Sequence, residues 1–394
     1  MTAAKTEHYR SVVIVAGEAS GDLHGANLVR EMKALDPSLS FRGVGGRRLE
    51  GEGVGLVAQS SEMAVVGITE VFTKIRFILG VFSRLRKMLR KERPDLLVLI
   101  DYPDFNLRLA AAAKAAGVPV FYYISPQVWA WRKSRVHQIR RVVDRMAVIL
   151  PFEKAFYADM GLTVHFVGHP LLDVVKRSQP REKSLADFGL RDKQPIVSLL
   201  PGSRDKEIRS LLPVMLSAAV LLKENYPEAQ FILPLADTLD PRMVDQIIRT
   251  YPLPVTVVSG QIYDAVSLAD VALVASGTAT LETALLEIPM VIVYRISALT
   301  AAIGKRLIRL DHIGLVNIIA GKTLVPELIQ EDVNASRLAD EAMKILSDRK
   351  RYGDIRKGLA EIRNKLGKTG ASCRAAQLAL NMMDHSIMAD HDSC

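Results

Sequence analysis

The stretch "RSVVIVAGEASGDLHGA", residues 10–26, begins with an apolar run and continues with glycines spaced four apart. The run has the length and β-branching of a buried parallel strand, and the glycine-rich part is typical of a loop that opens a helix. Such units present backbone N–H groups to phosphate. This loop matches neither a P-loop nor a dinucleotide fingerprint, and Glu18 and Asp22 would repel a pyrophosphate. We therefore predict a strand–loop–helix unit that binds something other than phosphate.

The same alternation of apolar runs and helical stretches continues along the chain. Runs of strand length are "PDLLVLI", "VPVFYYI", "RMAVIL" and "LTVHFVG", and, after a polar linker at 176–195, "IVSLLPG", "QFILP", "VTVVSG", "ADVALVASG" and "PMVIVYR". This pattern predicts an α/β protein with two doubly wound, Rossmann-like domains. We expect these domains at residues 1–180 and 190–345, followed by charged helices at 346–394.

Composition limits the classes of function. The 394 residues are enough for two well-packed domains. Lys and Arg outnumber Asp and Glu by 52 to 43, and the resulting charge of +9 suits an anionic partner. Only 6% of residues are aromatic and no nucleic-acid motif is present, so we expect no nucleic-acid partner. The two cysteines, Cys373 and Cys394, have no framework spacing, which fits a reducing compartment.

Neither the N-terminal residues nor any later run indicates a secretory signal or a membrane span. The first ten residues, "MTAAKTEHYR", are polar, and no run reaches the roughly 18 apolar residues that would favour a spanning helix. We therefore expect a cytoplasmic protein.

Loops at the carboxyl ends of parallel strands are where ligands bind in such sheets. In "LLPGSRDKEI", residues 199–208, Gly202, Ser203 and Arg204 can offer donors to a phosphate at a helix N-terminus. In "VASGTATLETALLEIP", residues 274–289, Glu282 can accept hydrogen bonds from a ribose diol. Each loop has a simpler alternative, a turn or an ordinary helix cap. Together the two loops predict a nucleoside diphosphate site in the second domain.

Two further loops are candidates for the first domain. "LIDYPDFNLRLA", residues 99–110, puts Asp101 at the end of a buried strand, where a partly desolvated carboxylate can serve as a general base; a hydrogen-bonded loop Asp is the alternative. "YISPQVWAWRKSR", residues 123–135, combines two tryptophans with basic residues. The tryptophans suit a core, and the basic cluster suits either a phosphorylated acceptor or a solvated helix start.

The segment 68–94, "ITEVFTKIRFILGVFSRLRKMLRKERP", predicts a basic amphipathic helix. One interpretation is a crossover helix that packs on the sheet. The other is docking on an anionic lipid surface. The apolar residues of the predicted docking stripe are Ile68, Val71, Phe72, Ile75, Ile78, Leu79 and Phe82.

The remaining polar residues indicate no metal or cofactor. His169 precedes Pro170 near the linker and is interpreted as structural, and the one D-x-D pattern, "DHD", lies in the tail at 390–392. We therefore expect no divalent metal and no cofactor at the active site.

Taken together, the motifs resemble those of the lipid-A-disaccharide synthases of Gram-negative bacteria. The matching stretches, in order from residue 17 to residue 376, are "GEASGDLHGA", "MAVVGITEV", "IDYPDFN", "YYISPQVWAWR", "LPFE", "VGHPLLD", "LPGSR..EI", "SGTATLE", "NIIAGK..VPELIQ" and "GASCRAA". The resemblance implies a GT-B fold, in which two Rossmann-like domains face a cleft and the last helices cross back to the first domain.

It also implies an inverting, metal-independent transfer. UDP-2,3-diacylglucosamine would be joined to 2,3-diacylglucosamine 1-phosphate (lipid X) by a β-1,6 linkage with release of UDP, at the cytoplasmic face of the inner membrane. Asp101 is then the first candidate for the general base, and Glu18 and His24 are the alternatives. The predicted donor-binding residues are Gly202, Ser203, Arg204, Ser276, Gly277, Thr278, Thr280, Glu282, Asn317, Glu327 and Gln330. The predicted acceptor-binding residues are Ser20, Asp22, Gln127, Trp129 and Arg132.

Other functions stay open at this point. The chain could be another UDP-sugar enzyme of the same fold, similar to the peptidoglycan N-acetylglucosaminyltransferase or to a UDP-sugar 2-epimerase. It could also be a membrane-peripheral nucleotide-binding protein without catalysis, in which Asp101 is idle. Acyl-chain preference and oligomeric state, a homodimer included, are not indicated.

Overall fold

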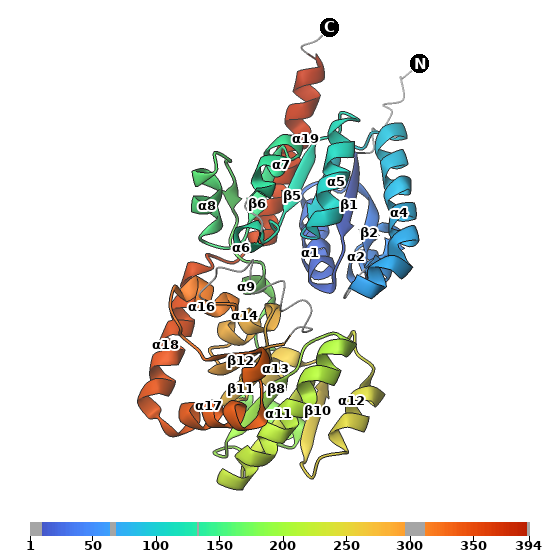
Figure 1. Cartoon of the computed structure of the whole chain (residues 1–394). Helices are drawn as coiled ribbons and strands as arrows, with labels where there is room; N and C mark the ends of the chain where they lie inside the picture. The colour runs from blue at the N-terminus through green and yellow to red at the C-terminus, as the bar shows by residue number, and fades with distance from the viewer. Residues whose placement is uncertain (1–9, 64–67, 132–133, 296–311, 392–394) are drawn as a thin grey trace. The chain divides into compact units, whose positions relative to one another are not determined.

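The structure, a computed structural model, describes residues 10–63, 68–131, 134–295 and 312–391. The chain divides into two compact units, one formed by residues 1–170 and 368–394 and the other by residues 171–367 (Figure 1). Each unit has its own parallel sheet. The α/β class with two Rossmann-like units is thereby confirmed, while the domain boundaries differ from those expected.

The first unit contains a seven-stranded parallel sheet in the order β3-β2-β1-β4-β5-β6-β7. Its strands are β1 (Ser11–Ala16), β2 (Ser40–Gly45), β3 (Gly55–Gln59), β4 (Leu96–Ile100), β5 (Val120–Tyr123), β6 (Arg145–Val148) and β7 (His165–Phe166). The order reverses direction between β1 and β4, as in doubly wound sheets.

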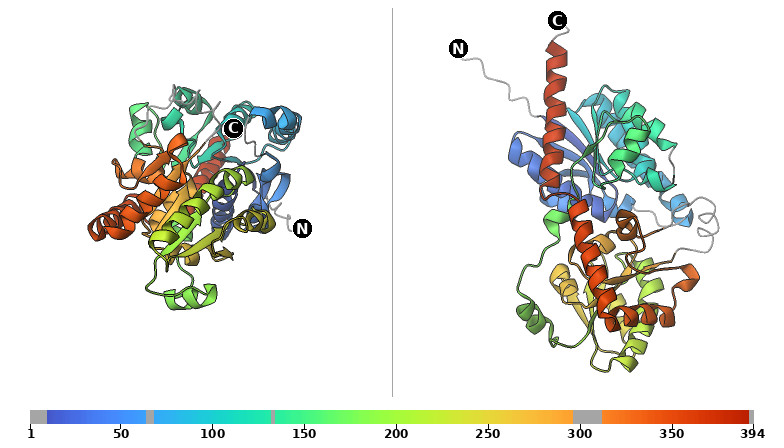
Figure 2. Two further views of the ribbon diagram at one scale, coloured as in Figure 1. Left: turned by 60° about the horizontal axis from the view of Figure 1, so that its bottom comes forward. Right: turned by 90° about the vertical axis from the view of Figure 1, so that its left-hand side faces the viewer.

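Helices cover both faces of this sheet. They are α1 (Ala19–Leu35), α2 (Arg47–Gly51), α3 (Ser60–Met63), α4 (Ile68–Lys91), α5 (Pro103–Lys114), α6 (Val128–Trp131), α7 (Arg135–Val142), α8 (Glu153–Asp159) and α19 (Ala371–His391). Residues of α4, α5 and α7 join one core with alternate residues of β1, β4, β5 and β6. Helix α19 packs along α1, away from these helices, as the right-hand view of Figure 2 shows.

The second unit repeats the design with six parallel strands in the order β10-β9-β8-β11-β12-β13. They are β8 (Ile196–Leu200), β9 (Gln230–Leu235), β10 (Val255–Ser259), β11 (Val271–Ala275), β12 (Met290–Tyr294) and β13 (Glu327–Ile329). The reversal falls between β8 and β11. Each strand except the edge strands β10 and β13 is almost wholly buried, which explains its continuous apolar run.

The helices of the second unit include α18, which we expected among those returning to the first domain. They are α9 (Leu171–Val174), α10 (Arg181–Phe188), α11 (Asp205–Asn225), α12 (Pro241–Ile248), α13 (Ile262–Ser267), α14 (Thr278–Leu285), α16 (Leu315–Ala320), the 3-10 turn η1 (Gln330–Asp332), α17 (Ala335–Ser347) and α18 (Arg349–Lys365). Helix α18 packs on α14, α16 and α17, so only α19 belongs to the first unit.

Three strands have no apolar run that would reveal them in the sequence. In β2, "SFRGVG", Ser40 and Arg42 are exposed, and Gly43 and Gly45 are buried where a Cβ would collide with Ile14 and Leu49. Strand β3 lies at the sheet edge and is mostly half-buried. Strand β13 has only three residues. Strands of this kind form because a neighbour supplies the hydrogen bonds, which is information from the tertiary structure.

Helix α4 packs one face on the first sheet, as the crossover interpretation predicts. Val81, Leu85 and Leu89 are fully buried in the core. Of the predicted docking stripe, Ile78 and Phe82 also pack against this core, whereas Ile75 and Leu79 are exposed. The side chains of Ile68, Val71 and Phe72 lie outside the described residues. No helix in the described part of the chain is long and apolar enough to cross a membrane.

Candidate active site

The first unit brings two carboxylates to the point where its strand order reverses. Glu18 follows β1 and Asp101 follows β4, and these two strands are neighbours in the sheet. In doubly wound sheets, ligands bind at the carboxyl ends of the strands where the order reverses, and both residues lie there. The structure brings these two base candidates close together, because the negative charge of Glu18 raises the pKa of the Asp101 carboxyl.

The backbone of Asp101 is held in an unusual conformation. Asp101 has φ +44° and the next residue, Tyr102, has φ +48°. The Asp101 carbonyl accepts hydrogen bonds from Asn106 Nδ2 (2.7 Å) and from the Tyr122 hydroxyl, and its N–H donates to the Ile124 carbonyl at 3.3 Å. Left-handed residues other than glycine cost energy and persist where neighbours over-determine them, often at functional sites.

The electrostatics of Asp101 suit proton transfer. Burial, and then the charge of Glu18, raises the pKa of Asp101 to about 7, while a hydrogen bond from the Tyr102 N–H opposes the shift. A carboxyl that titrates near neutral pH can accept a proton from a substrate hydroxyl and release it afterwards. The role of Asp101 as a general base stays a prediction.

The glycine-rich loop after β1 is shaped by its neighbours. A Cβ on Gly17 would lie 2.4 Å from Cγ of the Tyr102 ring, and a Cβ on Gly25 would lie 3.0 Å from Cδ1 of Ile100. The Tyr102 hydroxyl donates to the Met63 carbonyl at 3.1 Å, which fixes the ring over the loop. These glycines therefore allow the loop and α1 to approach β4 and the start of α5.

Asp22, a predicted acceptor-binding residue, binds backbone groups of the first unit in this structure. Its buried carboxylate accepts hydrogen bonds from the backbone N–H groups of Gly46 (2.6 Å), Arg48 (3.1 Å) and Leu49 (3.1 Å). These groups belong to the N-terminus of α2, so Asp22 caps that helix from a distance in the sequence. Because they accept these three hydrogen bonds, the carboxylate oxygens of Asp22 are directed towards the start of α2.

His24 is buried and lies against His169, with ring centroids 6.5 Å apart. Burial lowers the pKa of His24 to about 4, and burial together with His24 lowers the pKa of His169 to about 3. Both imidazoles are therefore neutral at neutral pH. This burial makes His24 a weaker base candidate than Asp101.

The predicted acceptor residues after β5 differ in their exposure to solvent. Gln127 is exposed in the loop before α6, whereas Trp129 is buried and packs edge-to-face on Phe152 with ring centroids 4.9 Å apart. Trp129 thus belongs to the core. Ser20 is half-buried in the first turn of α1. Arg132 lies outside the described residues.

A buried carboxyl group that the sequence analysis missed lies at the same edge of the sheet. Glu153 is buried at the start of α8 and accepts a hydrogen bond from Ser125 Oγ at 2.7 Å. Burial raises the pKa of Glu153 to about 7. The sequence does contain a signal for it, because "LPFE" comes at the end of the apolar run "RMAVIL". Asp101 was found from the same kind of position, just after a strand.

The reversal point of the second sheet carries the predicted diphosphate loop. Gly202 follows β8 with φ +117°, and α11 begins at Asp205. The Ser203 N–H donates to Glu207 Oε2 at 3.0 Å, and Arg204 Nη1 lies 3.1 Å from Glu207 Oε1. In the structure a carboxylate of the protein itself therefore contacts two of the three residues predicted to bind a phosphate.

The neighbouring loop, after β11, contains the second predicted donor motif. Gly277 and Thr278 are exposed at the N-terminus of α14, and Ser276 is half-buried. Thr280 is fully buried and its hydroxyl donates to the Gly277 carbonyl at 2.8 Å, so it stabilises the turn. Glu282 accepts a hydrogen bond from the Tyr263 hydroxyl at 3.0 Å.

Two residues assigned to the donor site through the resemblance use their side chains for hydrogen bonds within the second unit. The Asn317 side chain is buried and bonds the backbone of Leu324 (2.8 Å) and Val325 (2.8 and 3.0 Å). Glu327 accepts from the N–H groups of Ile313 (2.9 Å) and Gly314 (3.1 Å) and from Asn317 Nδ2 (2.7 Å). These contacts shape the start of α16 and the following loop.

Gln330, the last of the predicted donor residues, directly follows β13. It is half-buried with φ +54°. It therefore lies at the carboxyl edge of the second sheet, where a donor residue is expected.

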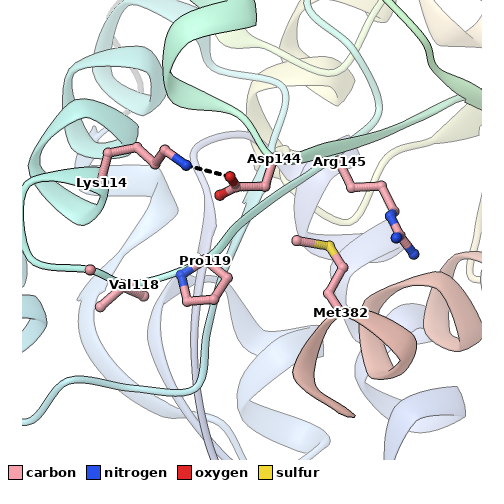
Figure 3. Close-up of a pocket in the computed structure, with 7 residues that line it drawn as sticks. Lys114, Val118, Pro119, Asp144, Arg145 and Met382 are labelled. Atoms are coloured by element: carbon pink, nitrogen blue, oxygen red, sulfur yellow. Dashed lines mark hydrogen bonds and ion pairs between the residues drawn. The ribbon is translucent and has the colours of Figure 1, made fainter. Parts of the chain in front are cut away.

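A surface cavity of about 320 Å³ lies elsewhere in the first unit (Figure 3). Its lining includes the ion pair Lys114–Asp144 and Met382 of α19. Because Asp144 and Pro119 precede β6 and β5, the cavity is at the amino ends of the strands. It is therefore separate from the candidate site, which lies at their carboxyl ends.

Metal-ligating side chains do not gather in threes or more anywhere within residues 10–63, 68–131, 134–295 and 312–391. The expectation of a metal-independent site stays a prediction.

Comparison with known families decides the class. The family model described as lipid-A-disaccharide synthetase matches residues 12–382. The chain belongs to this family. It is 55% identical over 376 residues to the lipid-A-disaccharide synthase of Syntrophus aciditrophicus and 51% identical to that of Geobacter sulfurreducens, covering 95% of this chain and 98% of each relative. This family member is accordingly a glycosyltransferase that forms the lipid A disaccharide.

Solved structures confirm the GT-B fold. At their low sequence identity they say nothing about activity. A UDP-GlcNAc 2-epimerase from Neisseria meningitidis superposes with a TM-score of 0.62 at 14% identity, covering 95% of this chain and 99% of that one. The calicheamicin glycosyltransferase CalG4 superposes with a TM-score of 0.61 at 15% identity, covering 96% and 99%. Identities this low do not support the epimerase alternative, whereas the synthase relatives match in sequence over almost their whole length.

Proposed function

We propose that the chain transfers the diacylglucosamine group of UDP-2,3-diacylglucosamine to the 6-hydroxyl of 2,3-diacylglucosamine 1-phosphate (lipid X), forming the β-1,6 bond and releasing UDP. The observation that carries this proposal is Asp101, a carboxyl that titrates near neutral pH at the reversal point of the first sheet, in a chain that matches its family over nearly its whole length. Substrates, mechanism and residue roles are parts of the proposal.

Asp101 acts as the general base. The acceptor hydroxyl is a poor nucleophile, so a base must remove its proton as the hydroxyl oxygen attacks the anomeric carbon. In this single displacement the bond to the UDP oxygen breaks as the new bond forms, and the configuration inverts. The pKa of Asp101, raised to about 7 by burial and by Glu18, matches this task. Glu18 keeps the basicity of its neighbour high.

The second unit binds the UDP group. Negative charge grows on the departing diphosphate, and the N–H groups at the start of α11 together with Arg204 are positioned at a helix N-terminus to stabilise it. Glu207 must then leave the Ser203 N–H when the diphosphate binds. Gly277 and Thr278 at the start of α14 add donors, and Glu282 binds the ribose.

Helix α4 associates with the inner membrane from the cytoplasmic side. Ile75 and Leu79 are 39% and 55% exposed, and Arg84, Arg86 and Lys87 are exposed in the following turns. Apolar residues that insert among acyl chains and basic residues that meet anionic headgroups are the features of interfacial helices. Such docking would bring the protein to acylated substrates that reside in the membrane.

The test is product formation by the purified full-length protein. Incubation with both diacylated substrates should yield UDP and a disaccharide 1-phosphate in equal amounts, measured by mass spectrometry. Omitting lipid X is the control, because an epimerase or a hydrolase would still convert the UDP-sugar. Conversion of the UDP-sugar that does not depend on the acceptor would disprove the proposal.

A further inference from the structure

Glu153 is a buried carboxylate that the proposed mechanism does not use. It is 1% exposed, and its Oε2 accepts hydrogen bonds from the N–H groups of Ile149 (3.2 Å) and Leu150 (2.9 Å). Its Oε1 accepts from Ser125 Oγ at 2.7 Å, and the Tyr157 hydroxyl donates to the same Ser125 oxygen at 3.1 Å. The carboxylate therefore joins the loop after β5 to the loop after β6.

Stability alone does not account for an ionisable group at this position. Burial raises the pKa of Glu153 to about 7, against the opposing effect of its hydrogen bonds with Ser125 and the two backbone N–H groups. Taking a carboxylate out of water is costly, and apolar groups of similar volume are often at least as stabilising. What the carboxylate adds is a fixed geometry for the groups that it binds.

Ser125, which Glu153 binds, is connected to Asp101 through the neighbouring residue Ile124. Ser125 directly follows Ile124, a β-branched residue with φ +63°, which is a rare and strained conformation. The Ile124 N–H donates to the Ala147 carbonyl at 3.0 Å, and the Ile124 carbonyl accepts from the Asp101 N–H at 3.3 Å. The strained peptide thus connects the end of β6 to the residue that we assign as the base.

We propose that Glu153 is a positioning residue for Asp101: its carboxylate holds Ser125, and Ser125 keeps the strained Ile124 peptide in the conformation that hydrogen-bonds Asp101. This inference rests on the proposed role of Asp101 as the base. Because Glu153 is buried, it acts through these residues and not by touching a substrate.

Ser125→Ala and Tyr157→Phe form a matched pair for the test. Both remove one hydroxyl from the same network, but only Ser125→Ala breaks the link to Glu153. In steady-state assays of the full-length protein with both diacylated substrates, Ser125→Ala should lower kcat about tenfold, within the loss that a small misplacement of a reacting group causes. The KM for the UDP-sugar should stay within about twofold, because its diphosphate site is on other loops.

Tyr157→Phe should keep kcat within about twofold of the wild type, with thermal unfolding of both variants as the check on folding. Wild-type kcat in Ser125→Ala, or an equal loss in Tyr157→Phe, would overturn the proposal.

Glu153→Gln separates positioning from proton transfer. The Gln carbonyl can accept from the two backbone N–H groups while its amide donates to Ser125 Oγ, so kcat should stay within about threefold, the cost of one weakened hydrogen bond. Loss of turnover in folded Glu153→Gln would also overturn the proposal, since a proton or a charge would then be required.

The wild type reports on the proposed function separately. If the wild type forms no disaccharide, the proposed function fails. If it is active and Ser125→Ala is equally active, only the inference about Glu153 fails.

Discussion

Asp101 combines three properties at one residue: a strained backbone, a desolvated carboxyl and a carboxylate neighbour. Each has a separate cause in the fold, namely the hydrogen bonds of its peptide groups, the burial at the end of β4, and Glu18 on the adjacent loop. Burial alone also raises the pKa of Glu153, so the adjacent Glu18 carboxylate and the place at the reversal point are what distinguish Asp101. We therefore expect Asp101 to be the residue whose replacement most affects turnover.

Asp101→Asn should lower kcat by about 10² to 10⁴-fold, the usual contribution of a general base. In the wild type kcat/KM should rise with pH up to about 7, the raised pKa of Asp101, because only the ionised carboxyl accepts the proton. This rise should be absent in the variant. A pH–rate profile that is the same in both proteins would contradict the assignment, and unchanged UDP binding is the control for folding.

The same substitution should stabilise the protein at high pH. The folded state raises the pKa of Asp101 from 3.8 to about 7, so folding retains a proton that the unfolded chain releases in this range. Stability from this residue therefore falls as the pH rises from about 4 to 7. Asp101→Asn should melt higher than the wild type at pH 8 and nearly equally at pH 4, as thermal unfolding can measure. A lower melting temperature at pH 8 would contradict this.

Glu207 contacts the groups that we assign to the diphosphate. Its carboxylate binds the Ser203 N–H and Arg204, so it competes with an anionic ligand and adds a negative charge beside it. Glu207→Gln should strengthen UDP binding about fivefold at low salt, corresponding to about 1 kcal/mol for one charge at contact distance in a hydrated site.

Titration calorimetry would measure this, with Asp205→Asn as the control, because Asp205 carries the same charge in the same helical turn. An equal gain in both variants would show a general charge effect, and weaker binding in Glu207→Gln would show that Glu207 instead orients Arg204.

At the scale of the element, α4 has one apolar face packed on the core and a second that is exposed. Val81, Leu85 and Leu89 face the sheet core, whereas Ile75 and Leu79 are exposed. The hydrophobic pattern of the sequence contains both faces and does not separate them. Packing on the sheet removes Ile78 and Phe82 from the predicted docking stripe, so the exposed pair carries the membrane proposal.

Replacing Ile75 and Leu79 together by Ser should lower binding to vesicles of anionic phospholipid by about tenfold or more, since each side chain contributes on the order of 1 kcal/mol of apolar burial. Thermal stability should be nearly unchanged because both residues are exposed. The matched control is Val257→Ser, a 42% exposed apolar residue of β10 in the second unit, which should bind vesicles like the wild type. Equal binding by all three proteins would exclude Ile75 and Leu79 as docking residues.

At the scale of the molecule, the two units have separate sheets and cores, and α19 completes the first unit. Ala375, Ala376 and Ala379 are fully buried, and α19 packs along α1, the helix that follows the Glu18 loop. The last helix is thus part of the candidate active-site unit, although it is far from that unit in the sequence.

Deleting residues 368–394 should therefore abolish transfer while UDP binding stays within about threefold of the wild type. The reason is that one face of the first unit loses its cover, whereas the loops that we propose to bind UDP belong to the other unit. Activity assays and UDP titration of the same sample would test this. Retained transfer, or loss of both properties, would contradict the separate roles of the units.

The local sequence pattern was sufficient to predict the central strands and the loops that follow them. Runs such as "PDLLVLI" and "IVSLLPG" are continuous because their strands are buried on both faces, and this property is visible in the sequence. The positions of Asp101, Gly202 and Arg204 follow from the rule that ligands bind at strand carboxyl ends. The fold class and the candidate loops could thus be predicted.

The tertiary structure decided which polar groups are free to act. Asp22 binds backbone N–H groups 24 to 27 residues away, and Glu327 binds those of residues 13 and 14 positions earlier. Glu153 reaches Ser125, which is 28 residues distant. A hydrogen bond or a burial shift depends on what lies within a few ångströms in space, and the sequence around each residue does not contain that information.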